Sequence, residues 1–177
     1  AHVTVIDNSP LQLEQDQVVA RRDDLTITSV LGDMRDLSKF PPDSFDLIFN
    51  PCSVCFIPDI RRVFDQSYRA LKRGGRLLCG FTNPARFIFD EEKITQKQFH
   101  VRHKLPYSDA THLNADEMDQ LRATHEPFMW SHSLEDLITG QIKAGFTIRD
   151  MYEDLDDKDP LTEYLPLYFA TLSEKAL

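Results

Sequence analysis

Two acidic residues follow short runs of β-branched and apolar residues, and together they could bind a ligand. Asp7 comes directly after Val3 to Ile6, and Asp33 follows residues 25 to 30, which read LTITSV. Runs of this kind are typical of buried parallel strands. In doubly wound sheets an acid at the tip of the second strand binds ribose hydroxyls, because a carboxylate offers two acceptor oxygens. The pattern therefore predicts a ligand-binding edge where two strands end.

Each of these polar positions also has a simpler interpretation. Asp7 precedes a turn made of Asn8, Ser9 and Pro10, so its carboxylate could cap that turn. Asp33 belongs to a Gly-Asp pair of a kind common in turns, and Asn50 could bond the turn that Pro51 starts. The matching positions of the two acids favour ligand binding for Asp7, whereas both interpretations stay open for Asp33 and Asn50.

Cysteine and histidine do not form a recognisable metal pattern. Cys52 and Cys55 make a C-x-x-C pair, but a redox pair normally opens a helix, whereas this one follows a strand and is interrupted by Pro58. His100 and His103 do not complete a common zinc spacing with it. We therefore expect no metal, and reduced thiols that line the wall of a cleft.

The segments that must position these residues alternate between strand and helix. Helical spacing of apolar residues appears in residues 10 to 22, in residues 59 to 71 with Asp59 as N-cap and KRGG as the stop, and from Ser133 to Gly145. Strand patterns fall in residues 45 to 49, 76 to 83, 147 to 154 and near the end of the sequence. This alternation predicts one α/β domain with a largely parallel sheet.

Residues 85 to 130 break the alternation. They hold most of the histidines, and PYSDATHLNADE reads as a loop or short hairpin. We predict an insert or cap over the cleft. Its aromatic residues indicate an apolar small molecule as ligand, although core packing under a loop explains them equally well; they are Phe87, Phe89, Phe99, Tyr107, Phe128 and Trp130.

Composition and charge limit the classes of molecule that the protein could bind. The sequence has 177 residues, 41% of them hydrophobic, and a formal net charge of −9 at pH 7. This charge argues against a nucleic-acid or anionic membrane surface, which requires clustered cations. One basic group, interpreted as a solvated helix face, comprises Arg61, Arg62, Arg69, Lys72, Arg73 and Arg76. With no apolar stretch near the roughly 20 residues of a spanning helix and no signal peptide pattern, we expect a cytoplasmic protein.

Several motifs together resemble one family. The acid-tipped strand with DNSPLQLEQDQ, the LGDMRDL segment, FDLIFNPCSVCFIPD, LKRGGRLL, AGF and YFATLSEKA are similar to the class I S-adenosylmethionine-dependent methyltransferases, in particular a bacterial group of small-molecule methyltransferase-like proteins. The resemblance covers essentially the whole sequence. It implies a Rossmann-like three-layer α/β/α sandwich, with a mostly parallel sheet and an antiparallel C-terminal strand, that transfers methyl groups from S-adenosylmethionine to an unidentified small molecule.

The resemblance also implies roles for six residues. Asp7 corresponds to the acid that binds both ribose hydroxyls, and Asn8 would lie beside the adenine. Asp33 corresponds to the acid that accepts the exocyclic amine of the adenine, with Met34 against the ring. The pair Asn50-Pro51 corresponds to the motif beside the reactive methyl group.

No catalytic residue follows from the sequence. Methyl transfer from a sulfonium depends mainly on positioning, and a base is needed only if the acceptor must lose a proton. His132, His112, His103 and Tyr107 are candidates for that base, although a structural role is the simpler interpretation of each histidine.

One departure from the family leaves alternatives open. The first strand and glycine-rich loop of the family have no counterpart, and Gly74 and Gly75 cannot replace them because they follow a helix. We therefore expect a longer protein of roughly 250 residues, in which a central strand lies between those carrying Asp7 and Asn50. A homo-oligomer that completes the sheet, a non-catalytic binding or regulatory module and, less favoured, a nicotinamide-dependent dehydrogenase stay as alternatives.

Overall fold

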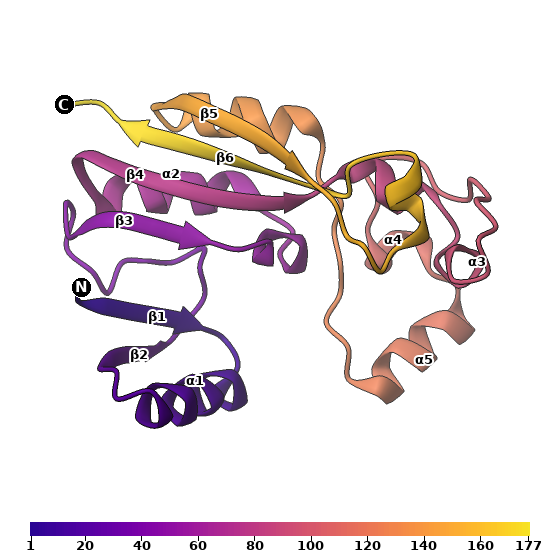
Figure 1. Cartoon of the computed structure of the whole chain (residues 1–177), viewed down its shortest axis with the longest axis horizontal. Coiled ribbons are helices and arrows are strands. Elements are labelled where there is room, and N and C mark those ends of the chain that lie inside the picture. Colours follow the sequence, from indigo (N-terminus) through magenta and orange to yellow (C-terminus); the bar gives the residue numbers. More distant parts are fainter.

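The computed structural model describes residues 1–177, and its strands form two separate sheets (Figure 1). In the small sheet, β1 (Val3–Asp7) pairs in parallel with β2 (Ile27–Leu31). The larger sheet has the order β3-β4-β6-β5, formed by β3 (Phe45–Asn50), β4 (Leu71–Thr82), β6 (Tyr168–Lys175) and β5 (Phe146–Asp154).

The larger sheet is mixed. Strands β3 and β4 are parallel, whereas β6 lies between β4 and β5 and runs antiparallel to both. The predicted α/β class and the antiparallel closing strand are confirmed. Parallel pairing is confined to β1 with β2 and β3 with β4. The sheet is therefore less parallel than the sequence predicts, because β6 lies antiparallel between β4 and β5.

A break separates the two sheets. Within residues 1–177, β1 pairs only with β2 and β3 pairs only with β4. The break therefore lies between the strands that carry Asp7 and Asn50, where the family resemblance implies a further strand. Both strands expose an edge there, and unpaired edges of this kind need a partner for their backbone groups.

Helix α1 (Pro10–Arg22) packs on the small sheet. It begins where the sequence indicates, because Ser9 Oγ accepts a hydrogen bond from Gln12 N at 3.3 Å and Pro10 occupies the first turn. Its side chains bury little of the helix surface, since only Leu13 and Ala20 are buried.

Helix α2 (Ile60–Ala70) packs on the larger sheet, together with the π-helical turn η3 (Glu135–Thr139) and α6 (Gly140–Lys143). Asp59 caps α2 as predicted by accepting from Arg62 N. The helix ends at Ala70, directly before KRGG, as predicted. KRGG itself lies in β4 rather than in a turn, since β4 begins at Leu71, which is fully buried and pairs with Phe45.

The main hydrophobic core lies between these helices and the larger sheet. Its twelve buried residues are Val54, Ile57, Ile60, Val63, Phe64, Leu71, Leu77, Cys79, Phe81, Leu137, Phe146 and Phe169. No helix of the structure is long and apolar enough to span a lipid bilayer.

The segment predicted as an insert lies beyond the carboxyl end of β4, beside the start of β6 (Figure 1). It contains η2 (Pro84–Ile88), α3 (Glu91–Ile94), α4 (Asp109–His112) and α5 (Ala115–Thr124), and η4 (Pro160–Glu163) lies against it. The prediction of a loop or hairpin over PYSDATHLNADE is wrong, because this stretch holds α4 and the start of α5. Asn114 and Glu117 form a capping box that begins α5.

Candidate active site

Asp7 and Asp33 meet at the carboxyl edge of the small sheet. Asp7 is the register partner of Leu31, and its backbone carbonyl accepts a hydrogen bond from Gly32 N at 2.9 Å. Gly32 permits this approach, because a Cβ at that position would lie 2.9 Å from Ile6 Cδ1. The two acids therefore follow neighbouring strands at one edge, as the sequence predicts.

The Asp7 carboxylate combines a structural contact with free acceptor capacity. Its Oδ1 accepts a hydrogen bond from Ser9 N at 2.7 Å, which is the turn-capping contact expected of this residue. Its Oδ2 accepts no hydrogen bond within the chain, and the side chain is half-buried. Turn capping and ligand binding are thus compatible, since a carboxylate offers several acceptor positions.

Asp33 is engaged more fully. Arg35 donates to it from Nε at 3.0 Å to both oxygens, from Nη2 at 2.5 Å and from its backbone N at 2.8 Å. The side-chain hydrogen bonds of Arg35 hold the pKa of Asp33 below its usual value. The structure leaves Asp33 little free acceptor capacity, so a hydrogen bond to an adenine amine requires Arg35 to move.

Asn50 connects the two sheets. Its Nδ2 donates to Met34 Sδ at 3.6 Å, and its Oδ1 accepts from Ser53 Oγ at 2.7 Å. The structure therefore brings Met34, which follows β2, against the end of β3, across the break between the sheets. Asn8 and Pro51 are exposed beside these contacts.

The C-x-x-C pair is structural in its contacts. Gly80 accommodates Cys52, because a Cβ on that glycine would lie 3.1 Å from Cys52 Sγ. Cys55 is buried, and its Sγ donates to the Cys52 carbonyl at 3.1 Å. Burial raises the pKa of Cys55 to about 11, so its sulfur stays a thiol near neutral pH.

A cavity of about 520 Å³ opens between the insert and the segment before β6. Its lining includes Thr82 at the end of β4 and Tyr168 at the start of β6. Cys79 is the register partner of Asn50, and Thr82 lies three residues beyond it. At roughly 3.3 Å per strand residue, this wall begins roughly 10 Å past Asn50 along the sheet.

The four candidate bases have different surroundings. His132 is buried, and because Val54 O can only accept, its Nε2 donates to that carbonyl at 2.9 Å. His112 Nδ1 lies 3.3 Å from Ser108 N. Only His103 and Tyr107 line the cavity. Burial, followed by the charge of Arg102, lowers the pKa of His103, which keeps its ring neutral near pH 7.

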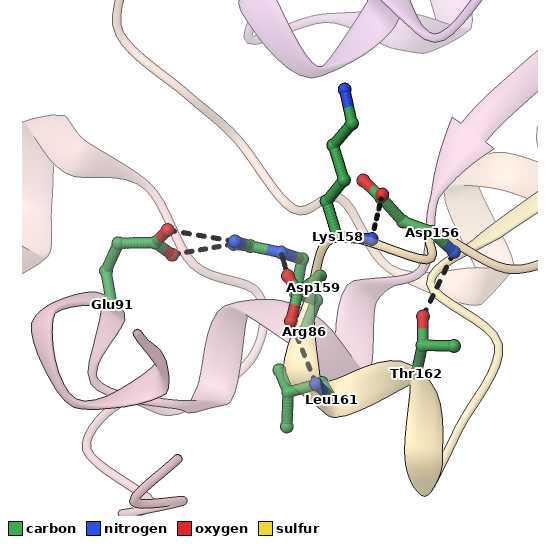
Figure 2. Close-up of polar contacts among 7 residues, drawn as sticks. All are labelled: Arg86, Glu91, Asp156, Lys158, Asp159, Leu161 and Thr162. Carbon is green, nitrogen blue, oxygen red and sulfur yellow. Dashed lines mark hydrogen bonds and ion pairs between the residues drawn. The ribbon is translucent and has the colours of Figure 1, made fainter. Parts of the chain in front are cut away.

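Arg86 is the centre of a charged group that lines the cavity (Figure 2). Glu91 accepts from Arg86 Nη1 at 2.7 Å and from Nη2 at 2.9 Å, while Asp159 accepts from Arg86 Nε at 3.0 Å. Burial opposes the charge of Arg86, but these two carboxylates raise its pKa above the usual value. Sequence reasoning missed this group, because residues 73 positions apart give no local pattern.

The insert aromatics are largely core residues. Phe87 and Tyr107 stack with ring centroids 5.8 Å apart and pack against Cys55. Phe89 and Phe99 pack against a second cluster that includes Leu161. Core packing under a loop therefore describes four of the six, although Phe87, Phe89 and Tyr107 also line the cavity.

Comparison with known proteins connects this geometry to a family. Residues 1–79 match the family model described as a methyltransferase domain. Over 175 residues the chain is 44% identical to an uncharacterised methyltransferase, YbaJ, of Bacillus subtilis (strain 168), covering 99% of this chain and 68% of that protein.

Solved structures share the fold. An S-adenosylmethionine-dependent methyltransferase from Mesorhizobium loti superposes with a TM-score of 0.72 at 17% identity, covering 98% of this chain and 80% of that one. A putative S-adenosylmethionine-dependent methyltransferase from Listeria monocytogenes gives a TM-score of 0.67 at 16% identity, covering 99% and 81%.

The chain therefore belongs to the methyltransferase family, with the fold of its S-adenosylmethionine-dependent members. The methyltransferase family recognised in the sequence is confirmed, and with it the enzyme class, while the solved structures confirm the α/β fold that the class I resemblance implies.

Proposed function

We propose that the carboxyl edge of the two sheets binds S-adenosylmethionine and that the methyl group passes to a small molecule in the cavity. The proposed cofactor-binding residues are Asp7, Asn8, Asp33, Met34, Asn50 and Pro51. The observation that supports this proposal is their convergence: the Gly32 bond to Asp7 and the Asn50 contact with Met34 gather the ends of β1, β2 and β3. Ligands of open α/β sheets bind at such ends.

The proposed residues fit the cofactor to different degrees. The free Oδ2 of Asp7 suits a ribose hydroxyl, and Met34 offers an apolar surface to a ring. The bound cofactor supplies a methyl group on a sulfonium, and the sulfur leaving group needs no protonation when the methyl group is transferred. The chain contributes mainly position and exclusion of water. If the acceptor must lose a proton, His103 is the candidate base that lines the cavity. Tyr107 lines it too, but burial and the neighbouring Asp109 raise the pKa of its phenol, which therefore stays protonated.

The test is titration of the full-length protein with S-adenosylhomocysteine by calorimetry. Asp7→Asn removes the charge but keeps the size, and we expect affinity to fall about tenfold to a hundredfold, since hydrogen bonds to charged groups contribute about 1.5–3 kcal/mol. Asp16→Asn on α1, whose carboxylate contacts only Gln12, is the matched control and should bind normally. Absence of binding by the unmodified protein would overturn the proposal.

The engagement of Asp33 by Arg35 makes its adenine contact a separate test of the proposal. Arg35→Gln frees the Asp33 carboxylate, so S-adenosylhomocysteine binding should become tighter if Asp33 accepts a hydrogen bond from the adenine. Unchanged affinity would remove Asp33 from the proposed cofactor-binding residues.

A cytoplasmic location and the absence of nucleic-acid partners are part of the same proposal. The three free cysteines suit a reducing compartment. The basic group of α2 and β4 is engaged within the chain, as in the pairs of Arg61 with Asp136 and Lys72 with Asp46. Cell fractionation and a DNA-binding assay test these two points, and sedimentation velocity tests for a homo-oligomer.

A further inference from the structure

The cavity beside the insert has an acidic wall. Six carboxylates line it, those of Glu91, Asp109, Glu117, Glu126, Asp156 and Asp159. Arg86 is the one permanently charged cation in the lining, since His103 has a lowered pKa. A low-dielectric cavity with one sign of charge concentrates ligands of the opposite sign.

The cations near the cavity neutralise only part of this wall, because two arginines pair with three of its six carboxylates. Arg86 is held by Glu91 and Asp159, so its donors are directed at the protein (Figure 2). Arg102 pairs with Glu117 from outside the lining. Lys158 points away from the Arg86 group in Figure 2. Asp156, Glu126 and Asp109 have no ion-pair partner within the chain.

Asp109 is the decisive residue in this wall. It is only 7% exposed, yet no cation lies within ion-pair distance of it. Its Oδ1 accepts from Tyr107 Oη and its Oδ2 from Met129 N, each at 2.6 Å, and both donors are neutral. Burial raises the pKa of Tyr107, so its phenol remains a donor. Buried carboxylates are normally compensated by a positive charge, and the side of Asp109 that faces the cavity is where a ligand could supply it.

Aromatic side chains complete the wall. Tyr107, Phe87, Phe89 and Tyr168 line the cavity together with these acids. Aromatic rings attract an ammonium group through their negative faces, most strongly where water is excluded. The acidic and the aromatic side chains of this wall therefore both favour a cationic ligand, whereas the carboxylates would repel a ligand that carries a carboxylate or phosphate.

We propose that this cavity binds its ligand, the methyl acceptor, as the ammonium ion of a small amine, with Asp109 as the counter-ion. Methyl transfer to nitrogen needs a free lone pair, so the bound ammonium first gives one proton to a base, and His103 in the same lining is the candidate. The neutral amine nitrogen then takes the methyl group as the sulfonium leaves as a thioether. The inference rests on the proposed function and identifies the substrate class of the same site. It replaces the apolar neutral molecule that the aromatic residues alone indicated, because the lining is more acidic than their sequence positions revealed.

Three probes of similar size and different charge test the proposal in the full-length protein: benzylamine, benzoate and benzyl alcohol. Calorimetry is run at pH 7, with and without S-adenosylhomocysteine. We expect benzylamine to bind at least tenfold more tightly than the other two. Asp109→Asn keeps the size but removes the charge: its oxygen can still accept from Met129 N, while its amide nitrogen can donate to Tyr107 Oη. This variant should weaken benzylamine binding at least tenfold.

Asp119→Asn is the matched control, because it removes the same charge from an exposed position on α5 outside the lining, where Asp119 pairs with Arg122. It should leave benzylamine binding unchanged. If Asp109→Asn disturbs the fold, Asp156→Asn removes a charge from another segment of the lining and should weaken binding about threefold or more.

Equal binding of benzylamine, benzoate and benzyl alcohol would overturn the inference, as would full benzylamine affinity in both lining variants. Failure of the proposed function has a different signature. In that case S-adenosylhomocysteine does not bind, while the selectivity among the three probes is measured without it.

Discussion

The two sheets differ sharply in how well they are packed. All twelve residues of the main core belong to residues 54 to 169 and surround the larger sheet. The unit formed by β1, α1 and β2 buries only Leu13 and Ala20. Large apolar side chains lie exposed on that unit, among them Val3, Leu11, Val18, Val19, Leu25 and Leu31.

Asp7 and Asp33 therefore lie on the part of the fold that has few buried residues. Because few buried contacts hold the small sheet, we expect it to be less stable than the larger sheet. Regions with few buried contacts open at lower free energy than core strands, and binding regions are often drawn from them. Ligand binding at this edge would therefore stabilise the region that needs it most.

Core truncation in the two regions should give the largest contrast. Phe64 is fully buried and meets Phe81 edge to face at a centroid distance of 6.5 Å. We expect Phe64→Ala to lower the free energy of unfolding by about 3–5 kcal/mol, because it leaves a cavity in the main core. Leu13→Ala should cost no more than about 2 kcal/mol, at the low end for such changes. Urea unfolding measures both, and equal costs would refute the contrast.

Hydrogen exchange followed by mass spectrometry tests the same difference without mutation. In residues 1–177, amides of β4 and β6, which pair over seven register positions, should exchange only on global unfolding. Amides of β1 and β2 should open at a free energy about 2 kcal/mol lower, or roughly thirtyfold faster exchange. Saturating S-adenosylhomocysteine should reduce this gap in the full-length protein. Uniform protection of both sheets would show that the small sheet is not a separate unit.

Local patterns predicted the elements that depend on local chemistry. Asp59 begins its helix as expected, α1 spans the predicted residues 10 to 22, and the strands that end at Asp7 and Asn50 are where β-branched and apolar runs indicated. KRGG correctly predicts the end of α2 near Ala70, but the segment itself lies in β4 rather than in a turn, because Leu71 is buried and pairs with Phe45. The start of α5 was detectable, since Asn114 and Glu117 have the spacing of a capping box.

The candidate site was predictable only in part. The acids at strand ends appear in the sequence because each follows its own strand. The hydrogen bonds from Arg35 to Asp33 depend on a side-chain conformation that the sequence does not reveal. The cavity wall is assembled from distant segments, so neither Arg86 with Asp159 nor the burial of Asp109 leaves a local signal.

The smallest expected effect is a loss of stability at acidic pH. His132 is buried and its ring holds the end of the insert to Val54 beside β3. Burial lowers the pKa of His132 despite its hydrogen bond to Val54, so the unfolded chain binds a proton more readily than the folded one. Stability from this residue is therefore complete above the unfolded pKa of about 6.5 and falls as pH drops below it, by at most about 1.4 kcal/mol per pH unit.

Exchange measured at pH 7.5 and 5.5, corrected for the intrinsic rate, locates this effect. Protection should fall in residues 53 to 57 and 130 to 133, which the His132 contact joins, while β1 and β2 change little. His132→Gln retains a donor for Val54 but cannot titrate, so its stability should vary less with pH. His103 also has a lowered pKa and remains in the variant, which supplies the residual slope. If the free energy of unfolding of His132→Gln varies with pH as steeply as that of the unmodified protein, another group causes the acid sensitivity. An equal loss of amide protection in β1 and β2 would mean that acid destabilises the whole molecule rather than the contact between His132 and Val54.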